Sequence, residues 1–305
     1  LTFKVAEAQF ESANYQRAAQ LYTDYLRQFP NGLYVLNAHY NRGESYAVLR
    51  QYSQALADYE YVVERGQSRY YLRALEKAAL IAYNYSEDFA KAYDFYTKLE
   101  VAATNEDMRF EAQLGALRSA YRTGNQNAVI EQANKVANSP NANRNQIATA
   151  NFYLGKVSFD RKNYDNALTA FNRVVSQSDN EQTAEARYLI AYIYYLKRDL
   201  DRAQQLCINA NKESSAYPYW VAKSVLLLSD ILAEKGDLYN ARAALEALLE
   251  NYKDDQELIQ TARNKLNQLN QQIERGSRLA PGTDPTRLEF DNENAVTPRR
   301  RSGGN

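Results

Sequence analysis

Apolar and aromatic residues return at helical spacing along most of this chain, and each run of them follows a short polar turn. In residues 14–32, for example, Ala18, Tyr22 and Tyr25 follow a polar start at steps of three or four residues. Steps of this size place side chains on one face of an α-helix. The stretch therefore predicts an amphipathic helix that packs against another helix and ends at Pro30.

The same pattern recurs seven times, with a small residue at the same place after each polar turn. These signature residues are Ala18, Ala55, Ala92, Val129, Ala167, Ala203 and Ala241. The intervals between them are 37, 37, 37, 38, 36 and 38 residues. A nearly constant period of this length is typical of a solenoid in which one supersecondary unit is repeated.

A second amphipathic helix precedes each signature residue, so each repeat is predicted to be a helical hairpin. In the second repeat, Gly43 stands twelve residues before Ala55. Tyr52 opens the downstream helix, and Tyr59 follows the alanine by four residues. The corresponding residues of the fifth repeat are Gly155, Ala167, Tyr164 and Phe171. Small residues at a helix crossing let the two backbones approach, and the aromatic rings fill the space beside the crossing.

These residues resemble the signature of the tetratricopeptide repeat family, which has a small residue in the first helix and a small residue between two aromatics in the second. Pro30 and Pro140 fill the family's proline position at the end of a repeat. The period is about three residues longer than the ~34 residues usual for this family. The resemblance covers residues 1–253 and implies an all-α, right-handed α-solenoid of about seven hairpins. It also implies a non-enzymatic scaffold that binds other proteins.

Within that family, residues 15–66 are most similar to members from the bacterial envelope, namely the Tol-Pal-associated periplasmic proteins and the outer-membrane assembly lipoproteins. The shared features are an aromatic-rich downstream helix, a turn that begins at Pro30, and a following stretch with Tyr40, Gly43 and Tyr46. This resemblance implies a place in the bacterial periplasm or on the periplasmic face of the outer membrane, as part of an envelope assembly. The cytoplasm remains an alternative.

The last hydrophobic face of a solenoid needs a cover, and residues 254–276 are predicted to form that capping helix. Its apolar stripe consists of Leu258, Ile259, Ala262, Leu266, Leu269 and Ile273. Gly276 is expected to end it. Residues 277–305 contain Pro, Gly and Ser without hydrophobic periodicity, so we expect a disordered tail there. Leu1 falls inside the first helix of a repeat, and we expect the chain to be the C-terminal part of a longer repeat protein.

Composition argues against several classes of function. The chain carries 37 basic (Lys and Arg) and 37 acidic residues, and this balance argues against nucleic acid as a partner held by bulk electrostatics. No apolar run approaches the ~20 residues that span a bilayer, so no membrane-spanning segment is expected. Only 11 glycines and 6 prolines occur in 305 residues, which suits an all-helical chain.

Few residues could carry chemistry. His39 is the only histidine, so the usual nucleophile–histidine arrangements have almost nothing to build on, and a helix-surface or partly packed imidazole is expected. Cys207 occupies a position that aromatics hold in other repeats, and it is expected to be a small core residue. No phosphate loop, paired-histidine zinc motif or calcium loop occurs. We therefore predict no enzyme activity, no cofactor and no metal.

The upstream helices are expected to line the concave side of the solenoid, and aromatic residues recur at fixed positions on them. The predicted partner-binding residues are Tyr40, Tyr83, Tyr121, Phe152, Phe159, Tyr188, Tyr192 and Tyr195. Tyrosine supplies both contact area and hydrogen bonds, so the set indicates a groove for a segment of another protein. A glycan or peptidoglycan-strand binding module is the alternative, because such rings also stack on sugars. Any single tyrosine could also pack between repeats.

Overall fold

The structure, a computed structural model, describes residues 2–279, and every regular element within them is an α-helix. Seven hairpins, each of an A helix followed by a B helix, precede one last helix. The A helices are α1 (Thr2–Glu11), α3 (Val35–Val48), α5 (Tyr71–Asn84), α7 (Glu106–Thr123), α9 (Arg144–Asp160), α11 (Glu181–Leu196) and α13 (Pro218–Glu234). The B helices are α2 (Tyr15–Gln28), α4 (Tyr52–Glu64), α6 (Phe89–Ala102), α8 (Gln126–Ala137), α10 (Tyr164–Gln177), α12 (Leu200–Glu213) and α14 (Leu238–Asn251). The last helix is α15 (Gln256–Leu279).

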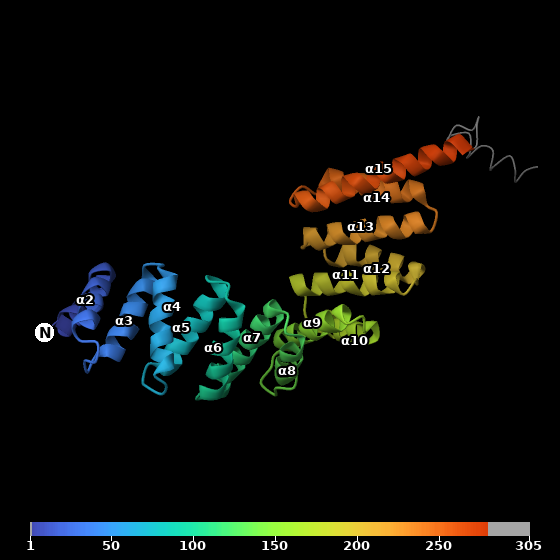
Figure 1. Cartoon of the computed structure of the whole chain (residues 1–305). Coiled ribbons are helices and arrows are strands. Elements are labelled where there is room, and N and C mark those ends of the chain that lie inside the picture. The colour runs from blue at the N-terminus through green and yellow to red at the C-terminus, as the bar shows by residue number, and fades with distance from the viewer. Residues whose placement is uncertain (1, 280–305) are drawn as a thin grey trace, which may run out of the picture. The chain divides into compact units, whose positions relative to one another are not determined.

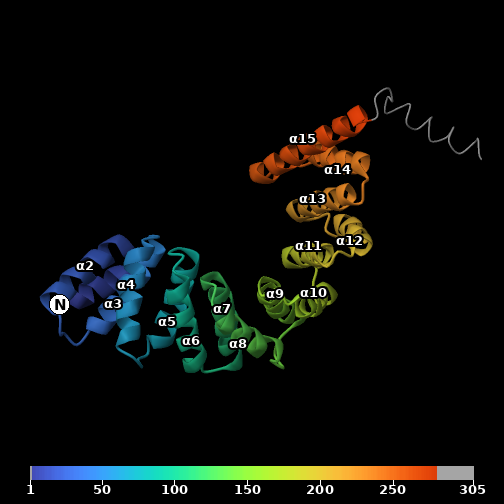
Figure 2. The same cartoon turned by 45° about the vertical axis from the view of Figure 1, so that its right-hand side comes forward.

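The chain divides into two compact units, Leu1–Ser178 and Asp179–Asn305. In the first unit, α1 to α10 form five hairpins, and each of α2, α4, α6 and α8 also packs against the A helix that follows it (Figure 1). In the second unit, α11 to α14 form two hairpins, α12 packs on α13, and α14 packs on α15 (Figure 2). Each unit is therefore an α-solenoid of stacked hairpins, as the repeat pattern predicts.

The seven signature residues lie at the crossings within the hairpins. The six alanines among them are fully buried, and Val129 is 1% exposed. Glycine makes room beside them, since a Cβ on Gly43 would lie 3.2 Å from Cε1 of Tyr59. The A helix and the B helix of a hairpin thus approach closely where small residues stand, and aromatic rings fill the remaining space. The predicted crossing is confirmed.

Each A helix is followed by a turn residue in the left-handed region, five residues before the signature residue. The turn residues are Ala13, Arg50, Glu87, Gly124, Lys162, Arg198 and Gly236, with φ from 50° to 84°. In six of the seven hairpins, the turn residue donates its N–H to the carbonyl three residues earlier, and the next residue donates to the carbonyl five residues earlier. This is the Schellman arrangement, which satisfies the last carbonyl groups of a helix.

The residue after the turn residue is the N-cap of the B helix. In five hairpins its side chain accepts a hydrogen bond from the backbone N–H three residues further on. These five residues are Asp88, Asn125, Asn163, Asp199 and Asp237. Two consecutive residues therefore end one helix and begin the next, which reverses the chain within a short polar segment.

α15 covers the apolar side of the hairpin formed by α13 and α14. Its residues Leu258, Ile259 and Ala262 are buried in one hydrophobic cluster with residues of both helices. The prediction that Gly276 ends this helix is wrong, because α15 continues to Leu279. A glycine inside a helix costs only about 1 kcal/mol, which flanking helical residues offset. The rest of the predicted tail, residues 280–305, lies outside the described residues.

Candidate protein-binding face

Two of the eight predicted binding residues belong to the core instead. Tyr40 is 7% exposed and Phe152 is 5% exposed. The Tyr40 ring stacks on Tyr70 with 4.5 Å between centroids, and the Phe152 ring packs against Phe171 of the same hairpin. Their prediction as binding residues is wrong, because these two rings are buried against neighbouring rings, whereas Tyr188 at the equivalent position of α11 is only half-buried.

Three further predicted residues, Tyr83, Tyr121 and Phe159 of the first unit, are half-buried and pack against other rings. At the hairpin turns, an aromatic near the end of an A helix contacts the aromatic that begins the B helix. These pairs are Phe10 with Tyr15, Tyr83 with Phe89, and Phe159 with Tyr164, with centroids 5.7, 5.3 and 5.9 Å apart. Tyr121 instead contacts Tyr153 of the next A helix at 4.8 Å. Such pairs stabilise the hairpins and their stacking. A binding role for these three residues stays a prediction.

The other three predicted residues form a continuous row on α11. Tyr188 and Tyr192 stack with 6.0 Å between centroids and 10° between ring planes, and Tyr192 and Tyr195 do so at 6.0 Å and 16°. Their spacing of four and three residues places all three on one helix face. Each is half-buried, and each packs with one side against a buried cluster that includes Ala191 and Ile231. We call Tyr188, Tyr192 and Tyr195 the tyrosine row.

The neighbouring helix α13 adds an aromatic ring and a cation at one end of the tyrosine row. The centroids of the Trp220 and Tyr188 rings lie 5.8 Å apart. Lys223 Nζ lies 5.3 Å from the centroid of the Tyr188 ring, within the range of a cation–π contact. The indole N–H of Trp220 is buried and finds no acceptor among the described residues. This end of the row therefore combines aromatic faces with positive charge.

The other end of the tyrosine row opens on a cavity of about 280 Å³ between α11, α13 and α15. The Tyr195 hydroxyl and the Arg198 guanidinium both donate hydrogen bonds to Glu234. Lys265 Nζ donates to the two carboxylate oxygens of Asp230 at 2.7 and 2.9 Å. The polar lining also includes Ser229, Gln268 and Gln272. Both signs of charge and several uncharged hydrogen-bonding groups thus face one small cavity.

The hydroxyls of Tyr188 and Tyr195 stay protonated at physiological pH, because the pKa of each is raised. Burial raises the pKa of Tyr188 above its ordinary value of about 10. The hydrogen bond with Glu234 raises the pKa of Tyr195 to about 12. The same hydrogen bond lowers the pKa of the Glu234 carboxyl. The face therefore presents neutral hydroxyl groups beside an ionised carboxylate.

Sequence reasoning missed Trp220, Lys223, Glu234 and Lys265 as members of this face. A usable signal exists for the last two, because residues about one repeat apart in sequence lie beside each other in successive repeat units. Arg198 and Glu234 are 36 positions apart, and Asp230 and Lys265 are 35 apart. Opposite charges separated by one period would have predicted both contacts.

The two residues that the sequence singled out as the most reactive types both lie in packing positions. Cys207 is fully buried, and burial raises the pKa of its thiol to about 12, so its prediction as a core residue is confirmed. His39 is half-buried. Its Nδ1 lies 2.7 Å from Oδ1 of Asp58, and its ring stacks on Tyr61 with 3.6 Å between centroids. The imidazole is therefore packed at the junction of α3 and α4.

Matches to known families agree with this architecture. Residues 3–70 match the family described as tetratricopeptide repeat. Residues 160–231 match the family described as anaphase-promoting complex, cyclosome, subunit 3. No curated protein matches the sequence. Within residues 2–279, none of the helices has both the length and the apolar character needed to cross a membrane.

Solved structures share the fold at low sequence identity. The C-terminal part of a TPR repeat-containing protein from Cytophaga hutchinsonii has 16% identity and a TM-score of 0.56, over 85% of this chain and 98% of that chain. The apo form of the quorum sensor NprR from B. thuringiensis has 13% identity and a TM-score of 0.56, over 99% of this chain and 87% of that one. Yeast Tom70 has 13% identity and a TM-score of 0.51, over 92% of this chain and 62% of its own.

The stacked hairpins, their small-residue crossings and the family matches define a repeat scaffold of the α-solenoid class. The tetratricopeptide repeat family is matched over residues 3–70, and the similar solved structures share the fold of stacked hairpins. Proteins of this family are typically non-enzymatic scaffolds for protein–protein interaction, and the predictions of a scaffold and of no enzyme activity agree with that match.

Proposed function

We propose that the second unit binds a segment of another protein along α11, α13 and α15, with the tyrosine row as its central contact. The observation that carries this proposal is the continuous stacking of Tyr188, Tyr192 and Tyr195 on one helix face. In the first unit the predicted aromatics pair with rings across the hairpin turns or with the next A helix. In the second unit three such rings follow one another and end at a polar cavity.

The chemistry of this face favours a polypeptide over a sugar chain. Half-buried tyrosines give large contact area at a low cost in side-chain entropy, which is why they are common in protein interfaces. The cavity beyond Tyr195 pairs Asp230 with Lys265, so the face offers both a carboxylate and an ammonium group to a partner. From Tyr188 to Tyr195 the row spans about 10 Å, the length of three or four extended residues. The occupant is therefore a short segment that carries apolar and polar side chains together.

We also propose that this binding serves an assembly in the bacterial envelope. The support is the similarity of residues 15–66 to envelope members of the family, in the aromatic-rich helix and the turn that begins at Pro30. Fractionation of the bacterium that encodes the chain tests this part. Recovery with periplasmic or outer-membrane markers supports it, and recovery with cytoplasmic markers contradicts it.

The class of ligand is tested with two probes on the full chain. A displayed library of random dodecapeptides and a glycan array are probed in parallel. Trp220 is the only tryptophan and lies beside Tyr188, so its emission reports an occupant of the row directly. We expect enriched peptides that change Trp220 emission on titration, and no bound glycan. Glycan binding that changes Trp220 emission, without any peptide that does so, would replace this proposal with a sugar-binding one.

A further inference from the structure

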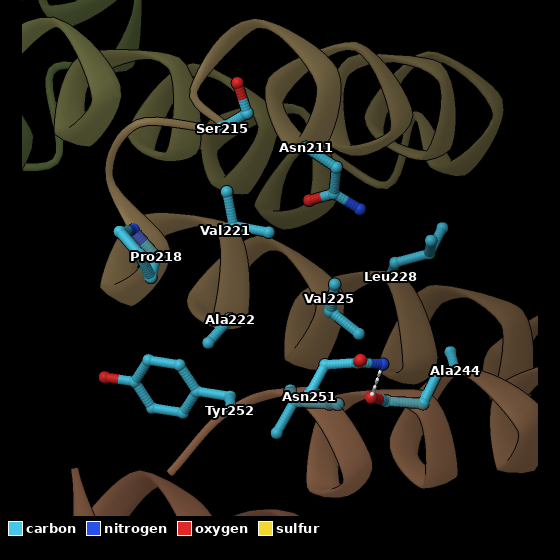
Figure 3. A pocket seen from close by; sticks show the side chains of 12 residues that line it. Asn211, Ser215, Pro218, Val221, Ala222, Val225, Leu228, Ala244, Asn251 and Tyr252 are labelled. Carbon is cyan, nitrogen blue, oxygen red and sulfur yellow. Dashed lines mark hydrogen bonds between the residues drawn. The ribbon is translucent and has the colours of Figure 1, made fainter. Parts of the chain in front are cut away.

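A second and separate opening lies on the B-helix side of the second unit. Figure 3 shows it between α12 and α14, with α13 as its floor. Its volume is about 480 Å³. Pro218, Val221, Val225 and Leu228 form the floor, and Ala244 and Ala247 form one wall. It shares no residue with the cavity beside the tyrosine row. We call it the apolar groove.

The apolar groove exists because two positions of the last repeat hold alanine. These positions follow the signature residue by three and by six residues. In the first six repeats the pairs of residues are Leu21 and Asp24, Asp58 and Tyr61, Phe95 and Lys98, Gln132 and Lys135, Ala170 and Arg173, and Leu206 and Asn209. Only the seventh repeat has alanine at both positions, as Ala244 and Ala247.

The second repeat shows how larger side chains fill the equivalent space. There Asp58 accepts hydrogen bonds from Arg42 at 2.7 and 2.8 Å, and Tyr61 stacks on His39. The residues at the positions of His39 and Arg42 in the seventh repeat are Val225 and Leu228. A charged and aromatic cluster is thus replaced by short apolar side chains, and the volume that the cluster would fill is left open.

The lining of the apolar groove differs from that of the similar openings in the first unit. None of its twelve lining residues is charged. The opening beside α4 and α6 is lined by Glu60, Lys91 and Asp94 among others, and the one beside α7 and α8 by Glu106, Arg109 and Lys135. A charge brought into the apolar groove would lose its hydration without finding a counter-charge. The lining therefore selects an uncharged occupant.

One polar group of the groove is left unsatisfied. The carboxamide of Asn211 extends from α12 toward the floor (Figure 3), and its Oδ1 is buried without a hydrogen-bond partner. An unsatisfied buried acceptor costs roughly 1–3 kcal/mol, and an occupant with an N–H donor removes that cost. On the opposite wall, Asn251 is satisfied, because its Nδ2 donates to the Ala247 carbonyl at 2.8 Å. The groove thus lacks one donor, on its α12 side.

We propose that the apolar groove binds an extended, uncharged segment of a partner polypeptide, whose backbone N–H donates to Asn211. The floor from Pro218 to Leu228 is about 15 Å long, at about 1.5 Å per helical residue. An extended chain of about five residues covers that length. Extended backbone has free N–H groups, whereas those of a helix are used within the helix. Alternate side chains of such a segment point toward the floor. This site is independent of the tyrosine row and adds a second binding surface to the scaffold.

The test uses random heptapeptides displayed on phage and selected against the full chain, followed by calorimetric Kd measurement on the enriched peptides. Ala247→Tyr fills the groove with the residue of the second repeat. Asn211→Leu removes the acceptor at nearly constant size. Asn209→Leu is the matched control, because Asn209 lies on the same helix but outside the groove and hydrogen-bonds to Gln205. If Ala247→Tyr lowers helicity, Ala244→Leu replaces it, with the residue of the sixth repeat.

We expect uncharged peptides whose Kd rises at least tenfold with Ala247→Tyr and with Asn211→Leu. Their Kd is unchanged with Asn209→Leu and with Tyr192→Ser, which separates this site from the tyrosine row. The proposal is overturned if no enriched peptide weakens with Ala247→Tyr, or if Asn211→Leu binds as the wild type does. It is also overturned if the neutral dye Nile red binds and is lost with Ala247→Tyr while no peptide behaves so, since the groove then takes small apolar molecules.

Discussion

Gly155 of α9 lies directly against the ring of Phe171 of α10, where a Cβ on the glycine would approach Cε1 of the ring to 2.5 Å. Phe171 is fully buried, so its ring has little room to move. Gly155→Ala is therefore expected to destabilise the first unit by about 1–2 kcal/mol, because overpacking outweighs the gain in helix propensity. Urea unfolding followed by circular dichroism measures the change.

Gly276 provides the control for that prediction, because it lies in α15 with nothing within 4 Å of the position of a Cβ. Gly276→Ala is expected to leave stability unchanged or raise it by up to about 1 kcal/mol. Equal effects of the two substitutions on the free energy of unfolding would show that the close approach of Gly155 to Phe171 does not make an added Cβ destabilising.

At a left-handed turn, by contrast, a substitution to glycine is expected to raise the free energy of unfolding. Lys162 has φ of 58°, where a residue with a Cβ is strained by roughly 1 kcal/mol and glycine is not. Lys162→Gly is expected to raise the free energy of unfolding by about 0.5–1 kcal/mol. Gly124→Ala makes the reverse change at φ of 73° in another hairpin, and it is expected to lower stability by a similar amount. Thermal unfolding of the two variants in parallel tests this, and a stabilising Gly124→Ala would contradict it.

Cys207 makes the stability of the second unit depend on pH in the alkaline range. Burial raises the pKa of its thiol from about 9 to about 12. The folded thiol keeps its proton where the unfolded thiol loses it, so the unfolded state binds fewer protons and stability falls as pH rises. The stability that the protonated Cys207 thiol contributes is fully present below pH 9. It is lost between pH 9 and 12, by up to about 1.4 kcal/mol per pH unit.

Comparison with Cys207→Ala separates the pH dependence of stability that comes from Cys207 from any pH dependence that comes from the tyrosines. The variant is less stable overall, because a buried side chain is shortened, but its stability is expected to fall less steeply with pH. Urea midpoints at pH 8, 9, 10 and 11 give both slopes. Parallel slopes, or rapid reaction of the native thiol with Ellman's reagent at pH 8, would show that Cys207 is not shielded.

The repeat itself could be predicted from the sequence because its packing is periodic. Every signature residue from Ala18 to Ala241 lies at a helix crossing, and a crossing tolerates only small side chains. The left-handed turns were not predicted, since only Gly124 and Gly236 mark them and five other hairpins use residues without that preference. Gly276 misled the placement of the last helix end, because one exposed glycine is too weak to stop a long helix.

The binding face was predictable only in part, for a different physical reason. Spacing places an aromatic on an A helix but does not say which ring it meets. Tyr83 meets Phe89 across a turn, whereas Tyr192 meets two tyrosines of its own helix. Trp220 and Lys223 reach the face from the next hairpin, at spacings unrelated to the aromatic pattern. Local pattern thus predicts which residues recur, while the stacking of hairpins decides which of them form a surface.

Replacing the rings of the tyrosine row tests most directly whether this row binds a segment of a partner protein. The variant carries Tyr188→Ser, Tyr192→Ser and Tyr195→Ser together, and a matched variant carries phenylalanine at the same three positions. A second control, Tyr52→Ser with Tyr85→Ser, removes a stacked pair of the first unit whose centroids lie 3.7 Å apart. Each is titrated with a dodecapeptide that changes Trp220 emission in the wild type, and its helicity is recorded on the same sample. Truncation of residues in such contacts typically costs about 2 kcal/mol or more each.

We expect the triple serine variant to keep its helicity, while its Kd for the peptide rises at least a hundredfold. The phenylalanine variant keeps most of its affinity, and the control pair changes nothing. Loss of helicity in the serine variant would assign the three tyrosines to packing between hairpins. Retained helicity with unchanged affinity would contradict a binding role for the tyrosine row.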